Sequence, residues 1–93
     1  MSDLMQQLHT AVEQQLLSPQ TRYVKLTLDR LCGLGLSVEE AISQIADCLG
    51  DVLERMLIEH RGFDEKRYRS LLEELPWPDE MSPDEAEANN LPL

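Results

Sequence analysis

Apolar residues recur at helical spacing along the first 75 residues of the chain, and capping and turn residues divide this part into four segments. When apolar positions repeat every three or four residues, one side of a helix can face a core. The pattern and its stop signals predict helices over residues 2–17, 19–33, 38–60 and 64–75. We therefore expect an all-α fold, a small four-helix bundle-like domain formed by residues 1–75.

The segment 38–60 is the longest and has the widest apolar stripe. Its apolar residues cover about half of the helix circumference, more than one neighbouring helix can bury, so we expect the other three helices to pack around it. The other half of this helix carries polar and charged residues: Glu39, Glu40, Ser43, Asp47, Asp51, Glu54 and Arg55. Evenly spread carboxylates do not converge on an ion, which favours a solvated face over a metal site.

Capping residues mark where the third and fourth helices begin. Ser37 and Glu40 have the spacing of a capping box, in which each side chain accepts a hydrogen bond from the other residue's backbone amide. Asp64 is placed to cap the fourth helix. Phe63 and Tyr68 have the spacing of a hydrophobic staple across that start, so we expect their side chains to touch.

The stretch "RLCGLGLSVEEAI" contains Gly33 and Gly35 beside a cysteine, which raises the alternative of a phosphate-binding loop. A dinucleotide fingerprint needs a preceding β-strand and a third glycine, whereas here the preceding segment is helical and position 38 is valine. We interpret both glycines as stops of the second helix, because glycine adopts positive φ without steric cost.

The charge of the chain limits the kinds of partner that it can bind. The net charge is -10, half of it from residues 76–93, which hold four of the five prolines and five acids with no base. This composition predicts a disordered acidic tail. An acidic chain repels nucleic acid and anionic membranes, so we expect no direct binding to either. A basic protein partner suits it better.

Neither a membrane span nor a secretory signal is evident in the sequence, and we therefore expect a cytoplasmic protein. Thiols stay reduced in that compartment. If the second and third helices form an antiparallel hairpin, Cys32 and Cys48 lie about 12 Å apart along it, beyond the roughly 7 Å that a disulfide spans. We interpret both as small core or edge residues.

His9 and Glu13 stand four residues apart on the first helix and are the weak candidates for a metal or catalytic site. Two ligands do not make a site, so we predict no cofactor and no metal. The simpler interpretation is that Glu13 orients the imidazole while the amide of Gln15, on the apolar stripe, satisfies a buried backbone group.

The segments "LHTAVEQQL", "TLDRLCGLGLSVEEAISQIADCLGDVL" and "FDEKRYRSLLEELP" resemble a family of small bacterial helical proteins, domain of unknown function 1841 and its relatives. The matching residues are His9, Val12, Glu13, Gln15, Leu16, Gly35, Ser37, Glu40, Ala41, Phe63, Asp64, Tyr68, Leu75 and Pro76. Most are caps, staples and core residues, so the resemblance implies a helical fold and little about function. Relatives often carry a further histidine where this chain has Glu39 or Ser43. Because this chain lacks that histidine, the resemblance gives little support to a shared metal site.

Two functions of different classes remain. The first is a non-enzymatic protein-interaction module that presents an acidic surface and forms a homodimer. Leu17, Leu26 and Ile58 fall off the apolar stripes of their helices and are its predicted interface. The alternative is a metal- or small-ligand-binding protein, or an enzyme, centred on His9 and Glu13.

Overall fold

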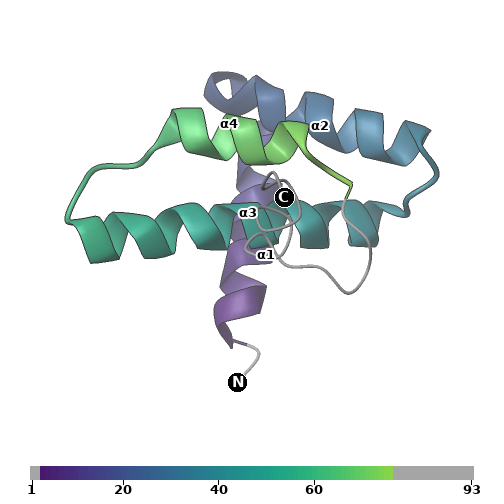
Figure 1. The fold of residues 1–93 in the computed structure, drawn as a ribbon. Helices are drawn as coiled ribbons and strands as arrows, with labels where there is room; N and C mark the ends of the chain where they lie inside the picture. Colours follow the sequence, from purple (N-terminus) through teal and green to yellow (C-terminus); the bar gives the residue numbers. More distant parts are fainter. Residues whose placement is uncertain (1–2, 77–93) are drawn as a thin grey trace, which may run out of the picture.

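The computed structural model describes residues 3–76 and contains four α-helices and one short 3₁₀ turn (Figure 1). This confirms the predicted all-α fold. The elements are α1 (Asp3–Leu17), η1 (Pro19–Thr21), α2 (Arg22–Gly33), α3 (Val38–Glu59) and α4 (Glu65–Glu73). The predicted disordered tail lies outside the described residues, apart from Pro76.

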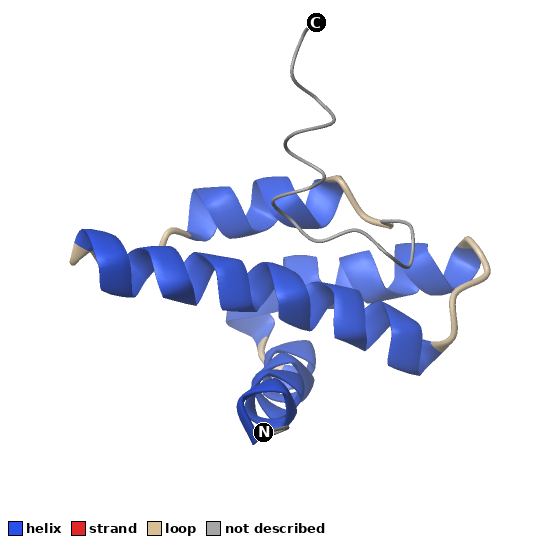
Figure 2. Cartoon of the chain, turned by 60° about the horizontal axis from the view of Figure 1, so that its bottom comes forward, coloured by secondary structure: helices blue, strands red, loops and turns tan. Residues whose placement is uncertain are grey.

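Helix α3 is the centre of the fold and packs against all three other helices, as its wide apolar stripe predicts. Helices α2 and α4 lie side by side along α3, whereas α1 crosses it (Figures 1 and 2). The helices are therefore not all aligned, as they would be in a regular bundle. The core draws on every helix: Leu8, Val12, Val24, Leu28, Leu31, Ala41, Ile42, Ile45, Ala46, Cys48, Leu49, Val52, Tyr68, Leu71, Leu72 and Leu75.

Gly50 is one point of close approach where α1 crosses α3. A Cβ atom added at Gly50 would lie 3.1 Å from Cδ1 of Leu8, tighter than ordinary van der Waals contact. Glycine in a helix interior is otherwise unfavourable by about 1 kcal/mol relative to alanine. The absence of a side chain at this position lets the Leu8 methyl group sit against the α3 backbone.

The α2–α3 corner follows the predicted capping chemistry. The Glu40 amide donates to Oγ of Ser37 at 3.1 Å, and the Ser37 amide donates to Oε1 of Glu40 at 3.0 Å, which confirms the capping box. This backbone hydrogen bond lowers the pKa of Glu40. Gly35 has a φ of 109°, as expected for a helix stop. Gly33 does not share this role, because it is the last residue of α2.

The remaining helix ends differ from expectation by a few residues. Ser18 accepts a hydrogen bond from the Gln20 amide, as predicted for a cap, but the chain first makes the 3₁₀ turn η1 and α2 begins only at Arg22. Asp64 caps α4 by accepting from the Arg67 amide at 3.0 Å. Helix α4 ends at Glu73, yet Leu75 is still buried in the core.

Replacing Ser37 with alanine should destabilise the domain by about 0.5–2 kcal/mol, because the start of α3 loses the acceptor for its orphan amide. The free energy of unfolding, measured by urea denaturation followed by circular dichroism, checks this. Ser70→Ala, an exposed serine on α4, is the matched control and should leave the midpoint unchanged. An equal midpoint for both variants would contradict the role of Ser37.

Among residues 3–76, none of the helices combines the length and the apolar character needed to cross a membrane.

Candidate functional site

His9 is half-buried on α1. Its electrostatic interaction is with Asp47 of α3 and not with Glu13. Glu13 is exposed and forms no hydrogen bond with His9. Burial raises the pKa of Asp47, and the nearby His9 opposes that rise. Because His9 and Glu13 form no hydrogen bond, the predicted orientation of His9 by Glu13 is wrong.

Within residues 3–76, no three histidine, cysteine, aspartate or glutamate side chains come together as metal ligands.

The raised pKa of Asp47 gives a stability that depends on pH. A carboxyl whose folded pKa lies above its unfolded value of about 3.9 stabilises the fold at low pH, and that contribution is lost as the pH rises through the folded pKa. Asp47→Asn should therefore raise the urea midpoint at pH 7, and the gain should disappear below about pH 4. Glu54→Gln, on the exposed face of the same helix, is the control. A lower midpoint for Asp47→Asn at pH 7 would instead show that its attraction to His9 exceeds the cost of burial.

The side chain of Gln15, on α1, forms a hydrogen bond with a side chain of α4 and not with a backbone group. Its Oε1 accepts a hydrogen bond of 2.6 Å from the hydroxyl of Tyr68, which is completely buried. The prediction that its amide satisfies a backbone group is therefore wrong. The Tyr68 ring also makes edge-to-face contacts with Tyr23, at 5.9 Å between centroids, and with Phe63, at 5.7 Å. The predicted contact between Phe63 and Tyr68 is confirmed.

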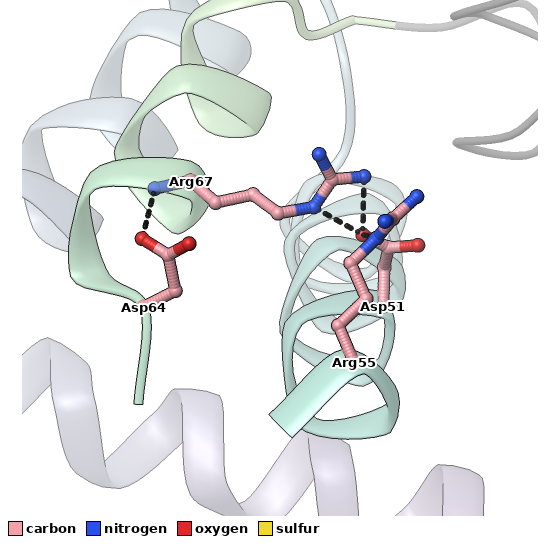
Figure 3. A network of polar contacts seen from close by, with 4 residues as sticks. All are labelled: Asp51, Arg55, Asp64 and Arg67. Atoms are coloured by element: carbon pink, nitrogen blue, oxygen red, sulfur yellow. Dashed lines mark hydrogen bonds and ion pairs between the residues drawn. The ribbon is translucent and has the colours of Figure 1, made fainter. Parts of the chain in front are cut away.

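The prediction that Asp51 lies on a solvated face of α3 is wrong. Its side chain is only 14% exposed, its Oδ2 accepts a hydrogen bond of 2.9 Å from Nε of Arg67, and Nη2 of Arg67 forms an ion pair with the same oxygen at 2.9 Å (Figure 3). Arg55 approaches the same oxygen at 3.5 Å. The backbone amide of Arg67 donates a hydrogen bond to the side chain of Asp64, the N-cap of α4. The network ties α4 to α3, so Asp51 has a structural role and is not a free surface carboxylate.

Both cysteines are free thiols, as predicted. Cys48 is completely buried, and this burial raises the pKa of its thiol far above the ordinary value. Because the thiolate is the reactive form, Cys48 is inert as a nucleophile at neutral pH. Cys32 is partly buried and packs against the core.

An open groove of about 250 Å³ runs between α2 and α4, lined by Tyr23, Leu26, Thr27, Arg30, Arg69, Leu72 and Glu73. The Arg69 guanidinium lies 4.8 Å from the centre of the Tyr23 ring, within range of a cation–π interaction. Burial raises the pKa of Tyr23, and the Glu65 carboxylate adds to the rise. The groove therefore combines apolar and aromatic surface with two cationic side chains and one acidic side chain, Glu73.

Arg30 lines this groove and also contacts the backbone near the end of α4. Its Nη1 donates to the Leu75 carbonyl at 2.7 Å and its Nη2 to the Leu72 carbonyl at 2.8 Å. Leu72 belongs to the last turn of α4 and Leu75 follows the end of that helix, a position where a cation is favourable. Arg30 thus fixes the point at which the chain leaves α4.

A second hollow, of about 370 Å³, lies along α1 and is lined by Gln6, Gln7, Thr10, Ala11 and Gln14. This lining offers amide, hydroxyl and methyl groups but no ionisable side chain. The α2–α4 groove has the richer chemistry.

The predicted interface residues are exposed, but they come from three separate elements. Leu17, at the end of α1, is 88% exposed, Leu26 on α2 is 57% exposed, and Ile58 near the end of α3 is 67% exposed. Leu26 lines the α2–α4 groove. That these three side chains belong to one interface stays a prediction.

The α2–α4 groove was not predicted from the sequence. Tyr23, Leu26 and Arg30 recur at helical spacing on α2, and Arg69 and Glu73 do so on α4, which places each set on one face. This spacing was available in the sequence. What it cannot show is that the two faces meet, because that depends on how α2 and α4 pack on α3.

Taken together, the described residues define a small all-α domain with an open groove between two adjacent helices. No family model, curated protein or solved structure matches this chain. The resemblance to domain of unknown function 1841 therefore stays a prediction.

Proposed function

We propose that this domain is a non-enzymatic protein-interaction module of the cytoplasm that self-associates through exposed apolar side chains. The observation that carries the proposal is the number of such side chains on so small a domain. Among the described residues, eight large apolar side chains are exposed: Leu4, Leu17, Leu26, Leu34, Val38, Leu57, Ile58 and Phe63. Single exposed leucines are ordinary on a protein surface, but grouped ones mark interaction sites.

Several of these side chains are grouped by their place in the chain. Leu57, Ile58 and Phe63 stand around the connection between α3 and α4, whereas Leu34 and Val38 stand around the connection between α2 and α3. Figure 1 shows these two connections at opposite ends of α3. Leu26 lines the α2–α4 groove. An interface that uses Ile58 therefore draws on the α3–α4 end of the domain.

A small domain gains stability from burying such groups against a second copy. Apolar surface removed from water contributes about 25 cal/mol per Å². A domain of this size buries a smaller share of its surface on folding than a large one does. A twofold dimer is the commonest way to bury more, because one patch then covers its own copy.

The excess of acidic residues on α1 and α3 supports a further, basic protein partner. Helices α1 and α3 together carry eight acidic side chains and one basic one. Complementary charge raises the rate at which such a partner is met and selects against wrong ones. Asp51 is not available for this contact, because it pairs with Arg67.

Sedimentation equilibrium at micromolar concentration tests the self-association. We expect a dimer, and we expect Ile58→Glu or Leu26→Glu to dissociate it with helicity retained, because a charge at the interface would lose its water. Gln14→Glu, an exposed change on α1, is the control and should leave the dimer intact. A monomer mass near 10.7 kDa for the unaltered chain would overturn the proposal.

A further inference from the structure

Two copies of this acidic protein repel one another least through the layer formed by α2 and α4. These two helices carry six of the eight lysines and arginines of the chain and three acids, whereas α1 and α3 carry eight acids and one base. Because the net charge is -10, a contact through α1 and α3 sets carboxylates against carboxylates. The α2–α4 layer, whose helices lie side by side (Figure 1), is the better surface for a second copy.

The charges at the groove in this layer are balanced. Arg30 and Arg69 line the groove together with Glu73. The Glu65 carboxylate lies at its edge, beside the Tyr23 hydroxyl, where it raises the pKa of the phenol and Arg69 lowers it. The groove and its edge therefore carry two positive and two negative side chains, which suits a partner that carries both signs.

The other cations of these helices lie outside the groove lining: Arg22, Lys25, Lys66 and Arg67. Two of them are paired within the chain, Lys25 with Asp29 and Arg67 with Asp51. The charge that a molecule in the groove meets is therefore that of the two arginines and the two glutamates.

Arg69 and Glu73 make the groove complementary to a second copy of itself. Both side chains are exposed, and neither forms an ion pair within residues 3–76. Residues four apart lie on one face of a helix, about 6 Å from each other along its axis. A twofold axis perpendicular to α4 sets two copies of this helix antiparallel. Arg69 of each copy then lies level with Glu73 of the other, and two equal ion pairs form at once.

Leu26 supplies the apolar contact at the centre of this arrangement. It is 57% exposed and lies on α2 between Tyr23, which Arg69 covers, and Arg30, which contacts the Leu72 carbonyl. It is therefore level with the part of α4 between Arg69 and Leu72. A twofold axis that exchanges residues 69 and 73 crosses α4 in the same part, so Leu26 lies near the axis and meets its own copy.

We propose that the α2–α4 groove is the dimer interface, and that a second copy of this chain packs on it about a twofold axis. Arg69 of each copy pairs with Glu73 of the other, and the two Leu26 side chains meet at the centre. This inference rests on the self-association proposed above and adds its place and its charge pairing. Of the three predicted interface residues, it puts Leu26 at the centre.

Charge reversal in the full chain, followed by sedimentation equilibrium, tests the pairing. Arg69→Glu and Glu73→Arg should each raise the dimer dissociation constant by about 100-fold or more, because each variant sets two pairs of like charges against one another. An equimolar mixture of the two variants should dimerise as the unaltered chain does, because every reversed side chain then meets an opposite charge. Such a recovery requires both variants to be folded, and circular dichroism checks this independently.

Lys66→Glu is the matched control, because it makes the same change of charge at an exposed position of α4 outside the groove lining. It should leave the dissociation constant within about twofold of the unaltered value. A monomeric unaltered chain would overturn the self-association and this inference with it. A dimer that survives both reversals, a mixture of the two variants that stays monomeric, or an equal loss from Lys66→Glu would overturn the groove assignment alone.

Discussion

Replacing Tyr68 with alanine should cost about 3–5 kcal/mol of unfolding free energy, the range for removing a large buried aromatic side chain. Tyr68 is completely buried on α4 and contacts the rings of Tyr23 and Phe63. Whole domains are stable by only about 5–15 kcal/mol, and small ones lie at the low end. We therefore expect the variant to be largely unfolded at 37 °C, as measured by circular dichroism and urea denaturation.

Tyr68→Phe is the matched control, because it keeps the ring and removes only the hydrogen bond to Gln15. It should cost about 1 kcal/mol, since the Gln15 oxygen is left without its donor. Burial raises the pKa of Tyr68, so the hydroxyl remains a donor well into the alkaline range and this difference should persist at high pH. A loss from Tyr68→Phe as large as that from Tyr68→Ala would show that the hydrogen bond, and not the ring, dominates.

Replacing Asp51 with alanine should cost about 1.5–3 kcal/mol, the range for hydrogen bonds to charged groups. The change removes from Arg67, which is 23% exposed, the carboxylate that accepts its Nε hydrogen bond and forms its ion pair, both at 2.9 Å. It also frees Arg55 from its ion pair. Because the network joins α4 to α3, we expect α4 to become more exposed to hydrogen exchange than α1 or α2.

The control for this prediction is Asp29→Ala, which breaks the ion pair of Asp29 with Lys25 on the surface of α2. Both partners are more than half exposed, so the loss should be within about 0.5 kcal/mol. Urea midpoints of the two variants give the comparison directly. If Asp29→Ala costs as much as Asp51→Ala, the partial burial of Asp51 does not matter and the two ion pairs are equivalent.

The sequence by itself determined where α3 and α4 begin and which face of each helix is apolar. Ser37 and Glu40 form their capping box because the partners are three residues apart, a distance that helical geometry fixes without help from the rest of the fold. The same holds for Asp64 and the Arg67 amide. The width of the apolar stripe on α3 likewise predicts its central position, since a wide stripe needs several neighbours.

Only the tertiary structure decided which polar groups meet across helices. Tyr68 and Gln15 are 53 residues apart, and Arg30 and Leu75 are 45 apart. Such partners become neighbours only once α1 crosses α3 and α2 lies beside α4, an arrangement that depends on how the side chains pack, for example Leu8 against Gly50. Periodicity assigns a residue to a face of its own helix but carries no information on the rotation of the next helix. For the same reason, the pairing of Asp51 with Arg67 and the α2–α4 groove follow from packing alone.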